Sequence, residues 1–180
     1  MSYEFESFID DVRATLRRGQ GPDEIEAVRG HLARLLANAA FVERTCGAGA
    51  KAGLHRIHVD PELGFEVLSY VNEKARKSPP HDHGASWAVY GQAISHTDMT
   101  EYRRIDDGSV PGKAKLEQTR HYRLHPGEVG IFLGRDIHDI DYSAESRFIR
   151  VTGTNLDRIE RSAYDLETGG VRQMAPQQAA

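Results

Sequence analysis

The chain has 180 residues, of which 39% are hydrophobic and 28% charged, enough for one soluble domain with its own core. Its net charge is −4, and no cluster of lysines and arginines suggests binding to nucleic acid or to a membrane surface. The single cysteine, Cys46, excludes an intrachain disulfide, and no apolar run is long enough for a transmembrane helix. The acidic start, MSYEFESFIDD, lacks the apolar core of a signal peptide, so we expect a cytoplasmic protein.

The N-terminal segment predicts two helices. Apolar residues recur with helical spacing from Phe5 to Leu16, and a Gly-rich break follows them. Pro22 then opens a second helix, whose apolar stripe extends to Ala39 and whose first turn is acidic, as the helix dipole favours. We expect residues 1–45 to form a helical segment packed on the domain that follows.

From residue 54 the sequence predicts many short strands. Segments such as FEVLSYVNE, GEVGIFL and SRFIRVTGT are rich in β-branched and aromatic residues and are separated by Gly, Pro, Asn or Asp. Short strands without helices between them are typical of a sandwich or a small barrel. We therefore expect a mainly β domain over residues 54–172 and a disordered tail over residues 173–180.

Two histidines stand one residue apart in the stretch SPPHDHGASWAVYGQ. Side chains at positions i and i+2 of a strand point to the same side, so His81 and His83 are placed to share a metal ion. We expect a third ligand from His138, which follows the segment GEVGIFL and a tight turn. Three imidazoles with open positions opposite suit iron and dioxygen, although manganese, nickel and zinc also accept them. The alternative is a set of solvated histidines.

This pattern resembles that of the cupin superfamily. The first cupin motif places His-x-His on a strand with a glutamate shortly after, and the second places a glycine–acid pair before a strand, a turn and a histidine. His81 and His83 match the first motif, and Gly127, Glu128 and His138 match the second. The resemblance implies a cupin barrel (double-stranded β-helix, or jelly roll), here preceded by two helices.

The missing glutamate narrows the resemblance. Its usual position holds Trp87 or Ala88, and a three-histidine site without the carboxylate resembles the thiol dioxygenases, the family of cysteine dioxygenase and 3-mercaptopropionate dioxygenase. The stretch PPHDHGASWAVYG resembles the mercaptopropionate branch most, through His-Asp-His, Trp87 and Gly91. The resemblance implies ferrous iron held by three histidines, with thiolate and dioxygen at the remaining positions and a sulfinate as product. An anionic substrate also neutralises the metal charge that three neutral ligands leave uncompensated.

Four residues are candidates for contact with the substrate. Arg150 lies amid apolar residues of a predicted strand, and its planar guanidinium suits a carboxylate. Arg56 lies about where cysteine dioxygenase has its carboxylate-binding arginine. Trp87 and Tyr90 follow the histidines and are expected to line the pocket. The alternatives are a surface ion pair for Arg56, a structural ion pair for Arg150 and plain core packing for the two aromatic residues.

The identity of the catalytic residue stays open. The family's tyrosine is absent from its usual strand, and the candidates to replace it are Tyr102, Tyr122 and Tyr142. Asp82 and Asp139 are candidates to orient the imidazoles, but strand alternation directs both away from the metal, which favours a surface role equally.

These features predict an iron(II)-dependent oxygenase of the cupin type that oxidises the thiol of a small organic acid with dioxygen. Two alternatives remain. One is a three-histidine cupin that cleaves carbon–carbon bonds of diketone-type substrates, and the other is a non-catalytic metal-binding cupin. We expect a small anionic substrate and dioxygen as partners, no nucleic acid or membrane, and a homodimer as the favoured oligomer.

Overall fold

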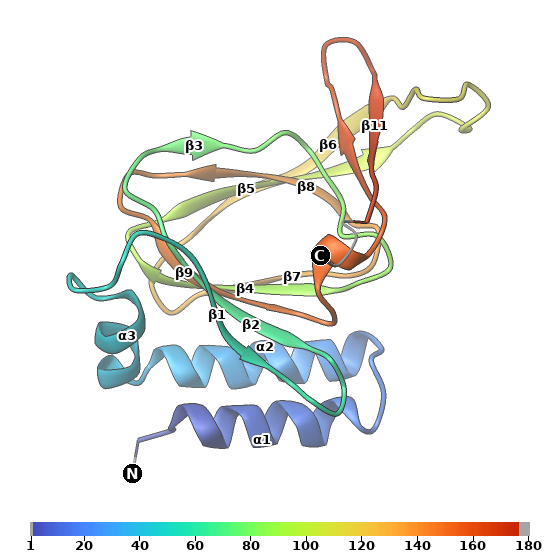
Figure 1. Ribbon diagram of the computed structural model, residues 1–180. Coiled ribbons are helices and arrows are strands. Elements are labelled where there is room, and N and C mark those ends of the chain that lie inside the picture. The colour runs from blue at the N-terminus through green and yellow to red at the C-terminus, as the bar shows by residue number, and fades with distance from the viewer. Residues whose placement is uncertain (1, 177–180) are drawn as a thin grey trace.

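The computed structural model describes residues 2–176, and it places a layer of helices beneath a barrel of strands (Figure 1). The helices are α1 (Phe5–Leu16), α2 (Pro22–Leu36) and α3 (Ala39–Cys46). The expectation of two helices was therefore wrong. The reason is Asn38, whose side chain accepts a hydrogen bond from the Phe41 N–H (3.0 Å) and so caps a third helix where we expected the second to end.

The rest of the chain is mainly β, as predicted. Its elements are β1 (Gly53–Val59), β2 (Glu66–Val71), β3 (Arg76–Lys77), β4 (Ala88–Ile94), β5 (Thr97–Arg104), β6 (Leu116–Leu124), β7 (Val129–Phe132), β8 (Ile137–Tyr142), β9 (Arg147–Thr152), a 3-10 turn η1 (Leu156–Arg158), β10 (Arg161–Tyr164) and β11 (Val171–Met174). One sheet has the order β1-β2-β9-β4-β7, and a facing sheet has the order β3-β8-β5-β6. From β2 to β9 the chain changes sheet at every connection except the β5–β6 hairpin, and each sheet receives four of these eight antiparallel strands, which is the jelly-roll connectivity that cupins share.

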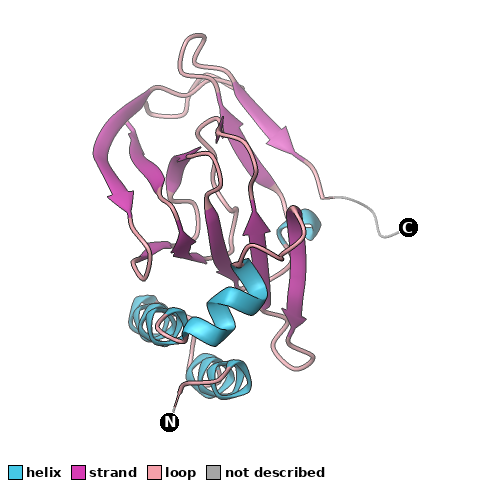
Figure 2. Ribbon diagram, turned by 90° about the vertical axis from the view of Figure 1, so that its left-hand side faces the viewer, coloured by secondary structure: helices cyan, strands magenta, loops and turns pink. Residues whose placement is uncertain are grey.

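The helices cover the outer face of the five-stranded sheet (Figure 2). Leu32 and Leu36 of α2 approach β4 so closely that a Cβ atom on Gly91 would lie 2.6 Å from one Leu36 methyl group. The buried cluster at this boundary contains residues of all three helices together with Val67, Val89 and Val151 of the sheet. The outer face of the sheet and the helices therefore share one apolar core.

A second core lies between the two sheets. On β4, Ala88 and Tyr90 point into this space, whereas Val89 points to the helices, as strand alternation requires. Aromatic rings fill much of the interior, including Phe132 and Phe148. The three histidines of the candidate site, described below, pack against this interior core.

Beyond the jelly roll, β10 and β11 form a hairpin. Strand β11 includes Gln173 and Met174, which we had expected to begin a disordered tail, and residues 177–180 lie outside the described residues. Within residues 2–176, no helix has both the length and the apolarity needed to cross a membrane.

Candidate metal centre

Backbone pairing fixes His81 in place between two strands. His81 and His138 exchange both backbone hydrogen bonds, at 2.9 and 3.0 Å, and His81 also bridges to Ala163 of β10. His83 follows in the loop that leads to β4. The structure therefore brings together the three histidines that the sequence predicted, although His81 and His83 precede the strand on which we expected them.

The three imidazoles form a compact cluster. One ring nitrogen from each of His81, His83 and His138 lies within 4.8 Å of the other two. Phe132 stacks on His138, with the ring centroids 3.7 Å apart. His83 and His138 are buried, and His81 is partly exposed. Among the described residues, the cluster contains three histidines and no carboxylate, in agreement with the missing glutamate of the sequence motif.

The ring nitrogens of this cluster suit a metal ion. His81 Nδ1 lies 3.0 Å from the Pro79 carbonyl oxygen, which leaves Nε2 of this ring available to a metal. Within residues 2–176, the buried atoms His138 Nε2 and His83 Nδ1 have no hydrogen-bond partner. Burial, and then repulsion within the cluster, holds the pKa of His83 and of His138 well below the usual range. The rings are therefore neutral, the form in which imidazole binds divalent metals, and the cluster fits such an ion.

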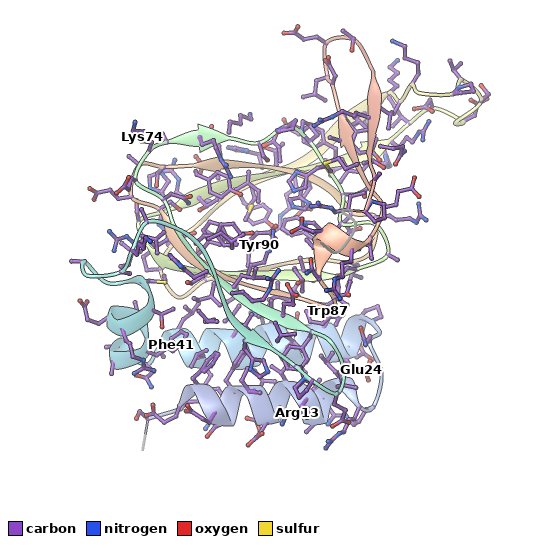
Figure 3. All side chains as sticks on the ribbon, viewed as in Figure 1. Arg13, Glu24, Phe41, Lys74, Trp87 and Tyr90 are labelled. Atoms are coloured by element: carbon purple, nitrogen blue, oxygen red, sulfur yellow. The ribbon has the colours of Figure 1, made fainter. Side chains whose placement is uncertain are left out.

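Tyr90 lies against this cluster. Its hydroxyl is 3.2 Å from His83 Nε2, and its ring contacts that of His138 edge-on, with the centroids 6.0 Å apart. In Figure 3, Tyr90 lies between the two sheets. The structure thus places Tyr90 beside the histidines, where we expected a substrate-lining residue.

Arg150 also faces the interior. In register it lies opposite Tyr90 on β4 and Leu68 on β2, and its Cζ is 5.0 Å from the centre of the Tyr70 ring. Burial opposes its charge, but the surrounding tyrosines outweigh this effect, and the pKa of Arg150 lies above its usual value. Among the described residues, its buried Nε has no hydrogen-bond partner. A permanent cation therefore lies in the same interior, 6.0 Å from the ring of Tyr90, with donor capacity for an anion.

Trp87 corrects one of our expectations. It does not line the interior but packs in the core between sheet and helices, where its Nε1 donates to the Gln20 side chain (2.9 Å). Its place just before Ala88, which faces inward, gives Trp87 the opposite direction from Tyr90. The resemblance therefore did not indicate in which layer Trp87 packs.

Arg56 lies apart from the cluster. It is on β1, at the edge of the sheet, and its Nε is 3.1 Å from a Glu66 carboxylate oxygen, while 44% of its side chain is exposed. The structure therefore supports the surface ion pair that was the alternative to substrate contact.

Asp82 and Asp139, the two aspartates next to the histidines, form hydrogen bonds with other parts of the chain and not with the imidazole rings. Asp82 Oδ1 accepts hydrogen bonds from the backbone N–H groups of Gly84 (2.8 Å) and Ser162 (3.1 Å), which fixes the loop between His81 and β4. Asp139 accepts a 2.6 Å hydrogen bond from Tyr102 on the outer side of the sheet. Tyr102 is thus directed away from the cluster.

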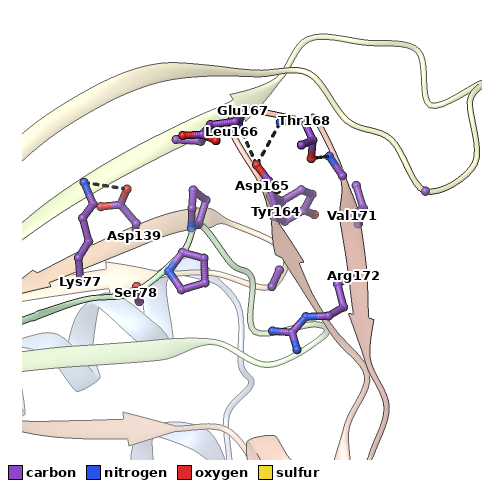
Figure 4. Close-up of a pocket in the computed structure, with 15 residues that line it drawn as sticks. Lys77, Ser78, Asp139, Tyr164, Asp165, Leu166, Glu167, Thr168, Val171 and Arg172 are labelled. Atoms are coloured by element: carbon purple, nitrogen blue, oxygen red, sulfur yellow. Dashed lines mark hydrogen bonds and ion pairs between the residues drawn. The ribbon is translucent and has the colours of Figure 1, made fainter.

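A separate cavity lies beside the segment that leads to His81. It has a volume of about 660 Å³ and is lined by residues of β3, β8 and the β10–β11 hairpin (Figure 4). Lys77 and Asp139 meet at its edge, 3.6 Å apart. Among its lining residues, Pro79 and Ala163 each contact His81 through their backbone, but the imidazole itself faces the barrel interior.

No protein-family model matches the chain. Among solved structures, it is similar to a cupin superfamily protein from Desulfitobacterium hafniense, with 11% identity over 59% of this chain and 83% of that one and a TM-score of 0.41. It is also similar to KdgF from Halomonas sp. (12% identity, 55% and 74% covered, TM-score 0.41) and to L-ribose isomerase from Cellulomonas parahominis (12%, 57% and 60%, 0.44). At these identities and TM-scores the likenesses say nothing about activity. The fold assignment rests on the strand order, and the site on its own geometry.

Proposed function

We propose that this protein is an iron(II)-dependent oxygenase that converts the thiol of a small organic acid into a sulfinate with dioxygen. The observation that carries the proposal is the site itself, in which three neutral imidazoles form a cluster without a carboxylate. Tyr90 contacts His83 of this cluster, and the cation of Arg150 lies 6.0 Å from the Tyr90 ring. Three neutral ligands leave the full charge of a divalent metal uncompensated, so the site favours an anion that binds the metal directly. Arg150 favours a second anion a short distance away.

In this proposal His81, His83 and His138 hold the metal. Ferrous iron supplies the one chemical step that the side chains lack, the activation of dioxygen toward a bound thiolate. The overall conversion, RS⁻ + O₂ → RSO₂⁻, is balanced, because both oxygen atoms join the sulfur and no outside reductant is consumed. Manganese, nickel and zinc also accept three imidazoles, so iron is the part of the proposal that rests on the chemistry rather than on the ligand set.

The remaining residues orient the substrate. Arg150, on β9, holds the carboxylate of the substrate. This contact directs the sulfur of a short acid toward the histidines. The Tyr90 hydroxyl, next to His83 Nε2, is placed to donate a hydrogen bond to the substrate or to oxygen bound near it. Phe132 and Phe148 line the same interior and limit the water around the reacting atoms.

The test is oxygen uptake by iron(II)-loaded protein with cysteine, 3-mercaptopropionate, cysteamine and 2,4-pentanedione in separate reactions. We expect uptake and an equal amount of sulfinate with a thiol acid, and much weaker uptake with cysteamine, which has no carboxylate. His138→Ala removes a ligand, and we expect it to lose both bound iron and activity. His125→Ala is the matched control, because His125 is exposed and lies outside the cluster.

Each other result has a definite meaning. Uptake with the diketone and not with thiols would favour cleavage of carbon–carbon bonds. Iron bound through the three histidines with no uptake in any reaction would favour a metal-binding protein without catalysis. Full activity of Arg150→Gln toward 3-mercaptopropionate would show that the carboxylate is held elsewhere.

A further inference from the structure

The hairpin after the jelly roll packs against the metal-binding segment. Asp82 donates its backbone N–H to the Ser162 carbonyl (3.0 Å), and Tyr164 donates its own to the Pro80 carbonyl (2.8 Å). These bonds flank the antiparallel bridge between His81 and Ala163. In such a pair the two side chains lie on the same face of the sheet. Ala163 therefore lies on the side of the His81 imidazole.

The same register brings Arg161 to the metal-binding face. Arg161 and Ala163 are two residues apart on β10, so their side chains share a face of that strand. Because Ala163 lies on the side of the His81 imidazole, the Arg161 side chain points to that side as well.

Arg161 is only partly satisfied by its neighbours. Among the described residues its one ion pair is with Asp157, four residues earlier, at 3.2 Å, and 51% of the Asp157 side chain is exposed. Within residues 2–176, its buried Nε has no hydrogen-bond partner. Because the Asp157 partner is half exposed, a ligand carboxylate is able to displace it.

We propose that Arg161 is a second anion-binding residue of the site, and that the preferred substrate is a small acid with two carboxylates besides the atom that it gives to the metal. Arg150 from β9 holds one carboxylate, and Arg161 from β10, on the facing side, holds the other. This inference rests on the proposed function only for which substrate atom binds the metal. The pairing of two carboxylates with two arginines does not depend on it.

The substrate class can be tested without oxygen chemistry. We would measure binding of succinate and of butyrate, which differ in one carboxylate, to the full-length metal-loaded protein by calorimetry without oxygen. We expect succinate to bind at least about tenfold more tightly, equivalent to about 1.4 kcal/mol. Arg161→Gln should abolish this difference and leave butyrate binding unchanged, whereas Arg150→Gln should weaken both ligands.

Two further variants separate ligand binding from a structural role. Arg158→Gln removes an exposed arginine from the adjacent turn and should change neither ligand. Asp157→Asn removes the competing carboxylate and should tighten succinate binding, an effect that a purely structural ion pair would not produce. Equal binding of succinate and butyrate to the wild type, or equal loss of both in Arg161→Gln, would overturn the inference.

The oxygenase reaction gives an independent reading with mercaptosuccinate and 3-mercaptopropionate. If succinate is preferred through Arg161 but neither thiol yields a sulfinate, the two-arginine site stands and the oxygenase proposal fails. If both thiols are oxidised with the same KM and Arg161→Gln changes neither, the oxygenase proposal stands and the two-arginine site fails.

Discussion

At the scale of single residues, alternation along β4 assigns neighbouring side chains to different tasks. Tyr90 faces the interior and touches His83, while the preceding Val89 packs against the helices. At Gly91, the next residue, the absence of a side chain leaves room for α2, which lies directly above it. One short strand thus contributes both to the metal site and to the helix contact, and a substitution affects one or the other according to its position.

Tyr90→Phe tests the inward-facing hydroxyl. It removes one oxygen atom and keeps the ring that packs against Phe132 and Phe148. We expect kcat of the proposed oxygenation to fall by about 10- to 100-fold, the usual range for a polar group next to metal ligands, while bound iron stays near that of the wild type. Steady-state oxygen uptake and iron analysis on the same samples measure both.

Tyr142→Phe is the matched control for that experiment. Tyr142 is buried in the same interior core, but its ring stacks on Phe148 and not on a histidine. We expect its kcat to change by less than about threefold, because it loses a hydroxyl that is not positioned at the metal ligands. Equal losses of kcat in both variants would mean that Tyr90 acts through core packing alone.

At the scale of elements, we expect alanine substitutions at two glycines, Gly91 and Gly30, to have opposite effects on stability. A methyl group on Gly91 would meet side-chain atoms of Leu32 and Leu36 at 2.6–2.9 Å, so Gly91→Ala forces the packing between α2 and the sheet to shift. Overpacking of this kind typically costs about 1–3 kcal/mol of the free energy of unfolding. Gly30 lies inside α2, where an added Cβ atom would meet nothing within 4 Å, and Gly30→Ala should stabilise the protein by about 0.5–1 kcal/mol. Urea denaturation of the two variants checks both signs.

The turn between β1 and β2 is tied to α1 by Asp60. Its buried carboxylate accepts a 2.8 Å hydrogen bond from Arg13 Nε and bonds from the N–H groups of Glu62 and Leu63. Burial acts to raise the pKa of Asp60, but the Leu63 and Arg13 hydrogen bonds outweigh it and hold the pKa below its usual value. Because the folded-state pKa is lower than that of the unfolded chain, this stabilisation is complete above the unfolded pKa and is lost as the pH falls through the folded one.

Asp60→Asn should therefore destabilise the protein most near neutral pH. We expect a loss of about 2 kcal/mol at pH 7, since a bond to a charged group is broken, and a smaller difference from the wild type below about pH 4. Asp10→Asn is the control, because Asp10 binds the same arginine (2.9 Å) but is largely exposed. A pH-independent difference between Asp60→Asn and the wild type would contradict the assignment.

At the scale of the whole molecule, local patterns were sufficient for some features and not for others. The spacing of His81 and His83, and the motif that contains His138, were enough to predict the cluster, because motif spacing is a local property. The strand expected under His81 and His83 begins only at Ala88. The direction of Trp87 depends on which face of the sheet the helices cover, a fact that no local pattern contains. The pairing of His81 with Ala163 joins residues far apart in the chain, so the sequence alone does not place Arg161 near His81. The second arginine was therefore visible only in the fold.

Because the helices and the barrel share one core, we expect them to unfold together. Trp87, the only tryptophan, lies at their boundary and donates to Gln20 between α1 and α2, so its fluorescence reports this contact. Far-UV circular dichroism reports mainly the helices, and near-UV dichroism of the buried tyrosines reports the barrel interior. In a single cooperative transition the three signals have the same midpoint in urea.

Leu32→Ala provides the decisive comparison. Leu32 is fully buried in the helix–sheet core, and its truncation should cost about 2–5 kcal/mol. If the molecule is one cooperative unit, the midpoints of all three signals shift by the same amount. If the tryptophan and far-UV signals shift while the tyrosine signal stays at its original midpoint, the jelly roll is stable without its helices. The metal site would then depend on the barrel alone, and the helices would serve to cover the apolar face of the sheet.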